Sequence, residues 1–376
     1  MINRQGTLGV LPLFCILILG IGLMNHVMVV PPLMAVARRD AWLSVLVAII
    51  PFMAWTTVLY GIMRFTRQQP LLPWLRRHYG RIASGLLRAI FIVYLFFICI
   101  MTLKDTVTWT HNTYLPRTPL LALALSLVLL CVMAAWCGIQ AIAVTAGILL
   151  PFVIVFGDFV MSMNLPVKNY TLLQPMLEHG WYPMLSGSLY VGGGLAELIV
   201  ILLVQQELKR DVSVWKMWLL SLFLVLLVLG PVAGAIAEFG PDEAAKLRYP
   251  AFEEWRLVTI GQYIRHVDFL SIFQWLSGAF IRIAVSFLLL ADLLSGSPSD
   301  SPSGSGRKRK HLIWIAVLAA ASIVIVELPI SDMQYVRFMR QIYLPASFWG
   351  ITGVVFTLFG LAWIANKSRG KQENGA

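Results

Sequence analysis

Long apolar stretches alternate with short polar segments along almost the whole chain. Each stretch is close to the roughly 20 residues that cross a lipid bilayer as a helix. The pattern predicts ten membrane-spanning helices, at about residues 8–35, 41–63, 83–112, 119–138, 140–163, 182–205, 214–238, 267–294, 311–328 and 341–364. The division of the 119–163 region depends on Trp136-Cys137-Gly138 forming a tight turn. We therefore expect an all-α polytopic membrane protein in which residues 1–376 form a single transmembrane domain.

The composition agrees with the membrane class. Hydrophobic residues make up 59% of the chain and charged residues 12%, whereas about 25% of the residues in a soluble domain are charged. The first apolar run, from about residue 7 to residue 37, is too long for the core of a signal peptide. We expect it to stay in the membrane as a helix.

The 4 cysteines and 6 histidines show no pattern typical of metal binding or catalysis. The cysteines lie inside apolar runs without zinc or disulfide spacing, and the histidines are scattered. The sequence contains no nucleophile elbow and no phosphate-binding loop. We expect no enzymatic activity, no cofactor and no metal site. Nucleic-acid binding is not expected, because the basic residues are dispersed over separate loops.

Lysine and arginine residues predict the orientation. With ten spans, they are more numerous in the segments on the side of the two termini, which include the run Arg307-Lys308-Arg309-Lys310. Such residues favour the cytoplasmic side of a membrane, so both termini are expected in the cytoplasm. The net charge of +11 mainly reflects this bias, with a smaller contribution to binding anionic lipids of the bilayer.

Glycine clusters interrupt two of the predicted spans: Gly20 and Gly22 in the first, and Gly192, Gly193 and Gly194 in the sixth. Unwound backbone at membrane depth survives where it lines a cavity, and a pair of broken helices indicates a solute site in secondary transporters. Close helix packing is the alternative, because small residues let membrane helices approach one another. We expect unwinding at residues 192–194 and leave both interpretations open for the first span.

Three segments between the spans have a character of their own. Residues 71–79 mix apolar and basic side chains as a short interfacial helix does. Residues 241–266 contain apolar residues among charges, which predicts a helix lying on the outer face, with a lid as one possible role. Residues 295–306 are rich in Ser, Gly and Pro and predict a flexible cytoplasmic linker.

Three motifs, in this order and spacing, resemble the spore germination protein family. They are Tyr114-Leu-Pro-Arg-Thr-Pro119 after the third span, Glu197 behind the glycine cluster of the sixth, and Phe273-Gln-Trp-Leu-Ser277 leading to Arg282 in the eighth. The resemblance covers essentially the whole chain. It is to the permease-like B subunit of GerA-type nutrient germinant receptors, within the amino acid–polyamine–organocation superfamily.

The resemblance implies a fold and a set of partners. The expected fold is a five-plus-five inverted repeat (LeuT/APC-like) with helices 1 and 6 broken, and the two repeats cover about residues 8–163 and 182–364. The expected protein senses an amino acid or a similar nutrient in the spore inner membrane, alongside A and C subunits.

Helix ends at the two breaks would match an amino acid through backbone groups alone. Free N–H groups attract its carboxylate and free carbonyl groups attract its ammonium group. Side chains of spans three and eight would add specificity in the superfamily arrangement. The expected ligand-binding residues are Gly20, Gly22, Leu23, Tyr94, Ile98, Gly192, Gly193, Gly194 and Ser277, with Phe97 and Thr102 at a suitable depth.

Arg282 and Glu197 are charged residues within predicted spans, where charge is costly and a functional role is the default hypothesis. In sodium-coupled relatives of this fold, a sodium ion braces span one against span eight. We hypothesise that Arg282 takes this place by binding freed carbonyls between Gly20 and Leu23. A structural ion pair with Glu197, or snorkelling, is the alternative. Glu197 is expected either to cap the second half-helix or to couple the solute to protons.

Two functions use the same expected site. The resemblance favours a germinant-sensing membrane subunit that binds its nutrient at the centres of helices 1 and 6. The alternative is a sodium-independent amino acid transporter, with proton coupling as an option. A scaffold subunit whose pocket has decayed is a third and more distant interpretation.

Overall fold

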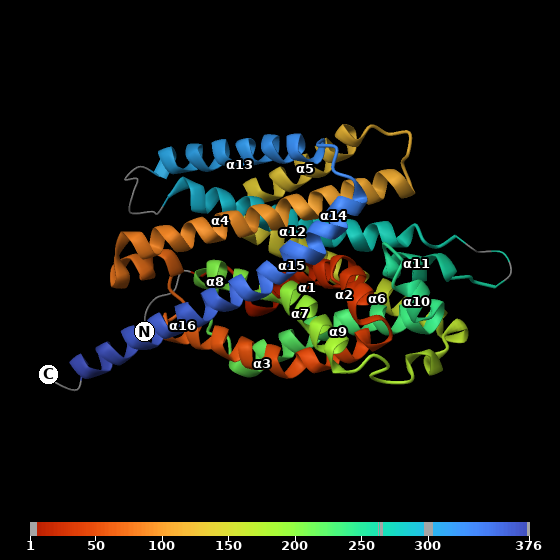
Figure 1. Cartoon of the computed structure of the whole chain (residues 1–376). Coiled ribbons are helices and arrows are strands. Elements are labelled where there is room, and N and C mark those ends of the chain that lie inside the picture. The colour runs from red at the N-terminus through yellow and green to blue at the C-terminus, as the bar shows by residue number, and fades with distance from the viewer. Residues whose placement is uncertain (1–5, 262, 264–265, 297–303, 374–376) are drawn as a thin grey trace.

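The computed structural model describes residues 6–261, 263, 266–296 and 304–373, and these residues form a bundle of long helices (Figure 1). The α-helices are α1 (Val10–Leu23), α2 (Val30–Ala37), α3 (Ala41–Phe65), α4 (Leu71–Thr113), α5 (Leu120–Cys137), α6 (Ile139–Met163), α7 (Trp181–Leu195), α8 (Ile201–Val204), α9 (Val214–Phe239), α10 (Pro241–Ala244), α11 (Pro250–Leu257), α12 (Leu270–Ser295), α13 (Gly304–Val326), α14 (Asp332–Phe338), α15 (Leu344–Ala346) and α16 (Thr352–Glu373). Turns with π geometry are η1 (Met24–Met28), η8 (Met339–Tyr343) and η9 (Ser347–Ile351). Turns with 3₁₀ geometry are η2 (Arg38–Asp40), η3 (Leu165–Val167), η4 (Tyr170–Leu173), η5 (Ala196–Val200) and η6 (Gln205–Glu207).

Nine helical stretches in the described part of the chain are long and apolar enough to cross a membrane. The first, Val10–Phe65, has 56 residues and would be about 84 Å long as a straight helix, more than twice the roughly 30 Å of a hydrocarbon core. The chain reverses within it at Arg38, where φ is 46° and ψ is −119°, so α1–α2 and α3 are separate crossings (Figure 1). Each predicted span therefore corresponds to a helical crossing, and the all-α membrane class is confirmed.

Two glycines change the direction of the chain. Gly138 has a φ of 89° between α5 and α6, which confirms the tight turn that divides residues 119–163. Gly80 has a φ of 85° inside α4, so that a short helix beginning at Leu71 precedes the third span, as expected from residues 71–79. Only glycine adopts such a φ without strain.

The two ends of the bundle carry different parts of the chain. The start of α4, the end of α12, the start of α13 and the end of α16 lie at one end, and α10 and α11 lie at the other (Figure 1). The Tyr79 hydroxyl of α4 donates a hydrogen bond to the Leu361 carbonyl of α16 at 2.6 Å. Which end faces the cytoplasm remains a prediction from the basic residues, and the inverted repeat also remains a prediction.

Helix α12 forms the centre of the bundle. It packs against α1, α4, α5, α6 and α13, and nearly all of its residues from Ser277 to Ala291 are buried. A helix that is apolar on every side is stable only when other helices or lipids surround it. The one charged residue within this buried stretch is Arg282, which therefore needs partners inside the protein.

Spans one and six do not unwind at their glycines. Helix α1 continues through Gly20 and Gly22 to Leu23 before the π-helical turn η1. Helix α7 continues through its glycine cluster to Leu195 before the 3₁₀ turn η5. The expected unwinding at residues 192–194 is therefore wrong, because the departures from α geometry begin only after the glycines. Whether η1 and η5 act as the breaks of a solute site remains a prediction.

Close packing explains the glycines of span six. A Cβ added to Gly193 would lie 2.5 Å from the Leu344 carbonyl oxygen of α15, and one added to Gly194 would lie 2.6 Å from Asn25 Oδ1 of η1. One added to Gly192 would lie 2.6 Å from the Phe348 ring of η9. Consecutive positions on a helix point to different sides, so three successive glycines allow three neighbouring segments to approach α7.

The expected linker at residues 295–306 is described only at its ends. Residues 297–303 lie outside the described residues, Ser295 is the last residue of α12, and residues 304–306 belong to α13.

Candidate functional site

An ion pair between Arg282 of α12 and Glu197 of η5 lies inside the bundle. The two side chains are 3% and 4% exposed, and Nη1 and Nη2 each donate to one carboxylate oxygen at 2.5 Å. Tyr343 of η8 donates a further hydrogen bond to the same carboxylate at 3.3 Å. Among the described residues, the donors to the Glu197 carboxylate are side chains. The role expected for Glu197 as a helix cap would instead require backbone N–H donors.

Arg282 also connects α12 to α1 and α4. Its Nε donates to Thr102 Oγ1 at 2.7 Å, and its Nη1 donates to the Gly20 carbonyl at 3.1 Å. In a regular α-helix this carbonyl would accept from the N–H of Met24, but that N–H donates to the Ile21 carbonyl, next to the change from α to π geometry. One guanidinium group therefore has the contacts of both the hypothesised brace and the ion pair.

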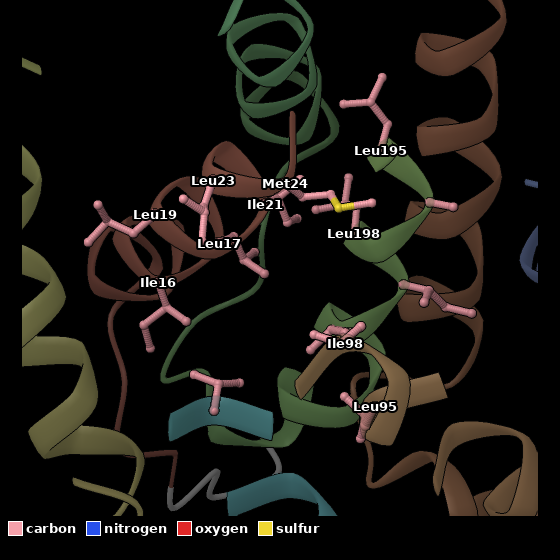
Figure 2. Close-up of a cluster of buried hydrophobic side chains, with 14 of the residues drawn as sticks. Ile16, Leu17, Leu19, Ile21, Leu23, Met24, Leu95, Ile98, Leu195 and Leu198 are labelled. Carbon is pink, nitrogen blue, oxygen red and sulfur yellow. The ribbon is translucent and has the colours of Figure 1, made fainter. Parts of the chain in front are cut away.

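Three of the residues expected at this depth share a face of α4. Tyr94, Ile98 and Thr102 are four residues apart and are all buried. Ile98 lines a cavity of about 40 Å³, which is large enough for water. This small cavity lies beside a cluster of apolar side chains from α1, η1, α4, α7 and η5 (Figure 2). Phe97 is 37% exposed and stacks on Phe338, so it does not face this cluster. The small cavity is too small for an amino acid.

A larger cavity of about 320 Å³ lies between α1, η1, α6, α9, α11 and α12. Its volume is within the range of about 300–1,000 Å³ that is typical of small-molecule sites. Most of its wall is apolar and includes Gly22 and Leu23 of α1 and Gly278 of α12. Its polar side chains are those of His26, Asp158, Tyr249, Glu254, Ser271 and Gln274. This composition suits a small solute with an apolar body and few polar groups.

Helix α11 covers one side of this large cavity. Trp255 Nε1 donates to Gln274 Oε1 of α12 at 3.2 Å, and Gln274 Nε2 donates to the Val153 carbonyl of α6 at 3.2 Å. Asn164, at the end of α6, donates to the Glu254 carbonyl at 2.7 Å. The helix expected within residues 241–266 is therefore present as α11, and it is attached to two walls of the large cavity.

The Tyr114 motif positions the start of α12. The Tyr114 hydroxyl donates to the Asp268 carbonyl at 2.9 Å and lies 3.3 Å from Ser271 Oγ. Burial raises the pKa of this hydroxyl to about 12, so it remains a donor at neutral pH. One turn earlier, Trp109 stacks on Trp275 with ring centroids 4.0 Å apart. These contacts hold Trp275 in the wall of the large cavity.

The predicted ligand-binding residues are divided among several places. Gly20 and Ile98 line the small cavity, with Tyr94 on the same face of α4, whereas Gly22 and Leu23 line the large cavity.

The remaining predicted ligand residues line neither cavity. Gly192, Gly193 and Gly194 are engaged in helix packing. Ser277 Oγ donates to the Phe273 carbonyl of its own helix at 2.6 Å. The predicted ligand residues therefore do not all share one of these two cavities, and a single site between spans one, three, six and eight remains a prediction.

Sequence reasoning missed the residues that make the large cavity polar. His26 lies within the first span, where any polar residue is a functional hypothesis, so this signal was available. Gln274 and Trp275 lie inside the motif that ends at Ser277, but the motif does not show which of its residues face a cavity. Glu254 has the charged neighbour Glu253 in the sequence, and only the packing of α11 distinguishes the buried residue from the partly exposed one.

Comparisons with known proteins agree on one family. The family model described as "Spore germination protein" matches residues 9–295. Spore germination protein XB of Bacillus anthracis is 38% identical over 355 residues, which cover 94% of this chain and 97% of that protein. Protein YfkT of Bacillus subtilis (strain 168), also named as a spore germination protein, is 22% identical over 264 residues, or 69% of this chain and 71% of that protein.

Proposed function

Because the chain belongs to the spore germination protein family and is a germination-related membrane protein, we propose that it is the nutrient-sensing, permease-like subunit of a spore germinant receptor. The observation that carries the proposal is the large cavity of about 320 Å³, a volume suited to an amino-acid-like solute. The nutrient binds in this cavity, beside η1 and under α11. The protein lies in the spore inner membrane with both termini in the cytoplasm, and its partners are A and C subunits.

Sensing requires two conformations that differ in their affinity for the nutrient. Helix α11 is well placed to differ between them, because it is a short element held over the large cavity by individual side-chain hydrogen bonds such as that from Trp255 to Gln274. A nutrient that contacts both η1 and α11 stabilises the conformation in which both close on it. The difference in affinity supplies the free energy of the signal to the partner subunits.

A sodium-independent amino acid transporter, with or without proton coupling, is the second candidate. The observation that favours it is the Arg282 guanidinium, which lies where α1 meets α12 and donates to the Gly20 carbonyl at 3.1 Å. A fixed cation at this junction removes the need for a sodium ion there.

Uptake separates the two candidates. Purified protein in proteoliposomes is offered labelled amino acids with and without a proton gradient, and binding is measured on the same preparation. We expect binding without uptake, as a sensor requires. Saturable uptake stimulated by the gradient would support the transporter instead.

Filling the large cavity tests its role as the nutrient site. Gly230 of α9 lines the cavity, and the nearest atom to a Cβ added there is Met161 Cε at 4.0 Å, so α9 can carry a larger residue. We expect Gly230→Leu to weaken amino acid binding by about tenfold or more, because the leucine side chain occupies the space of the solute. Binding is measured with the labelled amino acid that the unmodified protein binds best.

Gly353→Leu is the matched control for this substitution. Gly353 of α16 has no atom within 4 Å of an added Cβ and lines neither cavity, so binding should not change. Full binding by a folded Gly230→Leu protein would contradict the large cavity as the nutrient site.

A further inference from the structure

The charged groups in the wall of the large cavity are of one sign. The wall includes the carboxylates of Asp158 and Glu254 and, among the described residues, no lysine or arginine. We propose that the ligand of the large cavity carries a positively charged amino group and that the Glu254 carboxylate binds it. This inference rests on the function proposed above and names the chemical class of its ligand.

Glu254 is held in place with one carboxylate oxygen unused. The residue is 3% exposed, and its Oε1 has no hydrogen-bond partner within the described residues. Both oxygens pack against α9, where a Cβ added to Gly234 would lie 2.6 Å from Oε2 and 2.9 Å from Oε1. A hydrogen bond from Asn164 to the Glu254 carbonyl fixes the backbone. A buried carboxylate oxygen without a partner is costly, and a cationic donor removes that cost.

Lys168, whose positive charge influences Glu254, forms its ion pair with another carboxylate. Lys168 Nζ lies 3.4 Å from Glu238 Oε1, and both of these side chains are fully buried. The charge of the same ammonium group opposes the rise that burial causes in the pKa of Glu254, while its ion pair is with Glu238. When both acids are ionised, the cluster has one negative charge more than its positive charge, and a ligand ammonium group would complete the pairing.

The other groups of the wall suit an amine as well. His26 Nδ1 lies 3.2 Å from the Leu227 carbonyl oxygen. Because a carbonyl only accepts, Nδ1 carries the proton and Nε2 of the neutral ring is an acceptor. Trp255 and Trp275 add aromatic surface to the wall, and such surface attracts cations and covers apolar groups. An anionic ligand would instead meet two carboxylates.

Protonation of Glu254 provides a second signature. Burial, reinforced by Glu238, raises the pKa of Glu254 well above its usual range in spite of Lys168. An ammonium group binds the ionised acid, so its affinity increases as the pH rises through this pKa. The further titratable groups in the wall of the large cavity are His26, Asp158 and Tyr249.

Three compounds with similar apolar bodies test the inference: isoamylamine, isovalerate and leucine. We expect the purified chain to bind isoamylamine and leucine, and to bind isovalerate at least about tenfold more weakly. Binding of isoamylamine should strengthen as the pH is raised. This comparison uses the unmodified protein, so it does not depend on the folding of any variant.

Glu254→Gln removes the charge and keeps the shape of the side chain. We expect it to weaken isoamylamine binding by about tenfold and to abolish the dependence of binding on pH. Glu253→Gln is the matched control on the same helix, because Glu253 pairs at 2.9 Å with the exposed Arg256, and it should bind as the unmodified protein does. Thermal unfolding shows whether both variants are folded.

The outcomes separate this inference from the proposed function. Isovalerate binding equal to isoamylamine binding, or amine binding unchanged by Glu254→Gln, overturns the assigned charge. If Gly230→Leu still abolishes the binding, the large cavity remains the ligand site. Binding that survives Gly230→Leu overturns the proposed function, and no binding of any of the three compounds overturns both.

Discussion

Replacing Arg282 by methionine is expected to destabilise the protein by about 3–5 kcal/mol, because removing one partner of a buried ion pair leaves the other charge uncompensated. The Glu197 carboxylate is 4% exposed and would keep only the hydrogen bond from Tyr343 at 3.3 Å. Thr102 and the Gly20 carbonyl would each lose a donor as well. Thermal unfolding in detergent, followed by tryptophan fluorescence, measures the loss.

A double variant divides this loss between its causes. Arg282→Met combined with Glu197→Met removes both charges, and apolar replacements of a buried pair are often neutral or better. We expect it to regain most of the lost stability, and the two single variants complete a double-mutant cycle. A double variant as unstable as Arg282→Met would assign the stability to the contacts with α1 and α4 instead. Unchanged stability of Arg282→Met would contradict the structural role of the pair.

Binding by the double variant tests the brace separately from stability. If Arg282 holds α1 in the orientation that forms the large cavity, a stable double variant should still bind amino acids more weakly than the unmodified protein. Binding at full strength would show that the contact with the Gly20 carbonyl does not position α1.

Replacing Gly193 by alanine is expected to give the second largest effect, a destabilisation of about 1–3 kcal/mol or more, as overpacking does. The added Cβ would lie 2.5 Å from the carbonyl oxygen of Leu344 and 3.1 Å from its carbonyl carbon. These are backbone atoms of a buried residue that precedes Pro345, so no side-chain rotation relieves the clash. Helix α7 and the last span would have to move apart.

Gly85→Ala is the matched control for this substitution. Gly85 lies in α4, is exposed, and has no atom within 4 Å of an added Cβ. Alanine has a higher helix propensity than glycine by about 1 kcal/mol, so this variant should be at least as stable as the unmodified protein. Equal unfolding temperatures of Gly193→Ala and Gly85→Ala would contradict the close packing of α7.

The glycine clusters show why a correct motif led to a wrong local structure. A run of glycines lowers helix propensity, and it also permits the close approach of neighbouring segments. The sequence alone does not show which of these two effects is larger. Packing decides it here, because Leu344, Asn25 and Phe348 lie against the three glycines from three different segments. The resulting contacts favour the helix over the unwound backbone.

The two cavities show a similar limit. His26, Gln274 and Glu254 come from separate parts of the chain, and the large cavity exists only where α1, α11 and α12 leave space between them. Gly22 is predicted as a ligand residue because it interrupts an apolar run, and it lines the large cavity. Its separation from Gly20, which faces Arg282 instead, depends on the rotation of α1 about its axis.

The sequence by itself determined the membrane class, the approximate limits of the ten crossings, the tight turn at Gly138 and the helix on the 241–266 segment. These follow from apolar length, glycine conformation and local amphipathic pattern, which are properties of neighbouring residues. Only the tertiary structure decided that Arg282 meets Gly20, 262 positions away, and where the large cavity lies. It also decided that Glu254 is buried with an oxygen, Oε1, that has no hydrogen-bond partner among the described residues. The physical reason is that burial of polar groups depends on how distant helices are rotated and packed, and composition along one helix carries little information about that rotation.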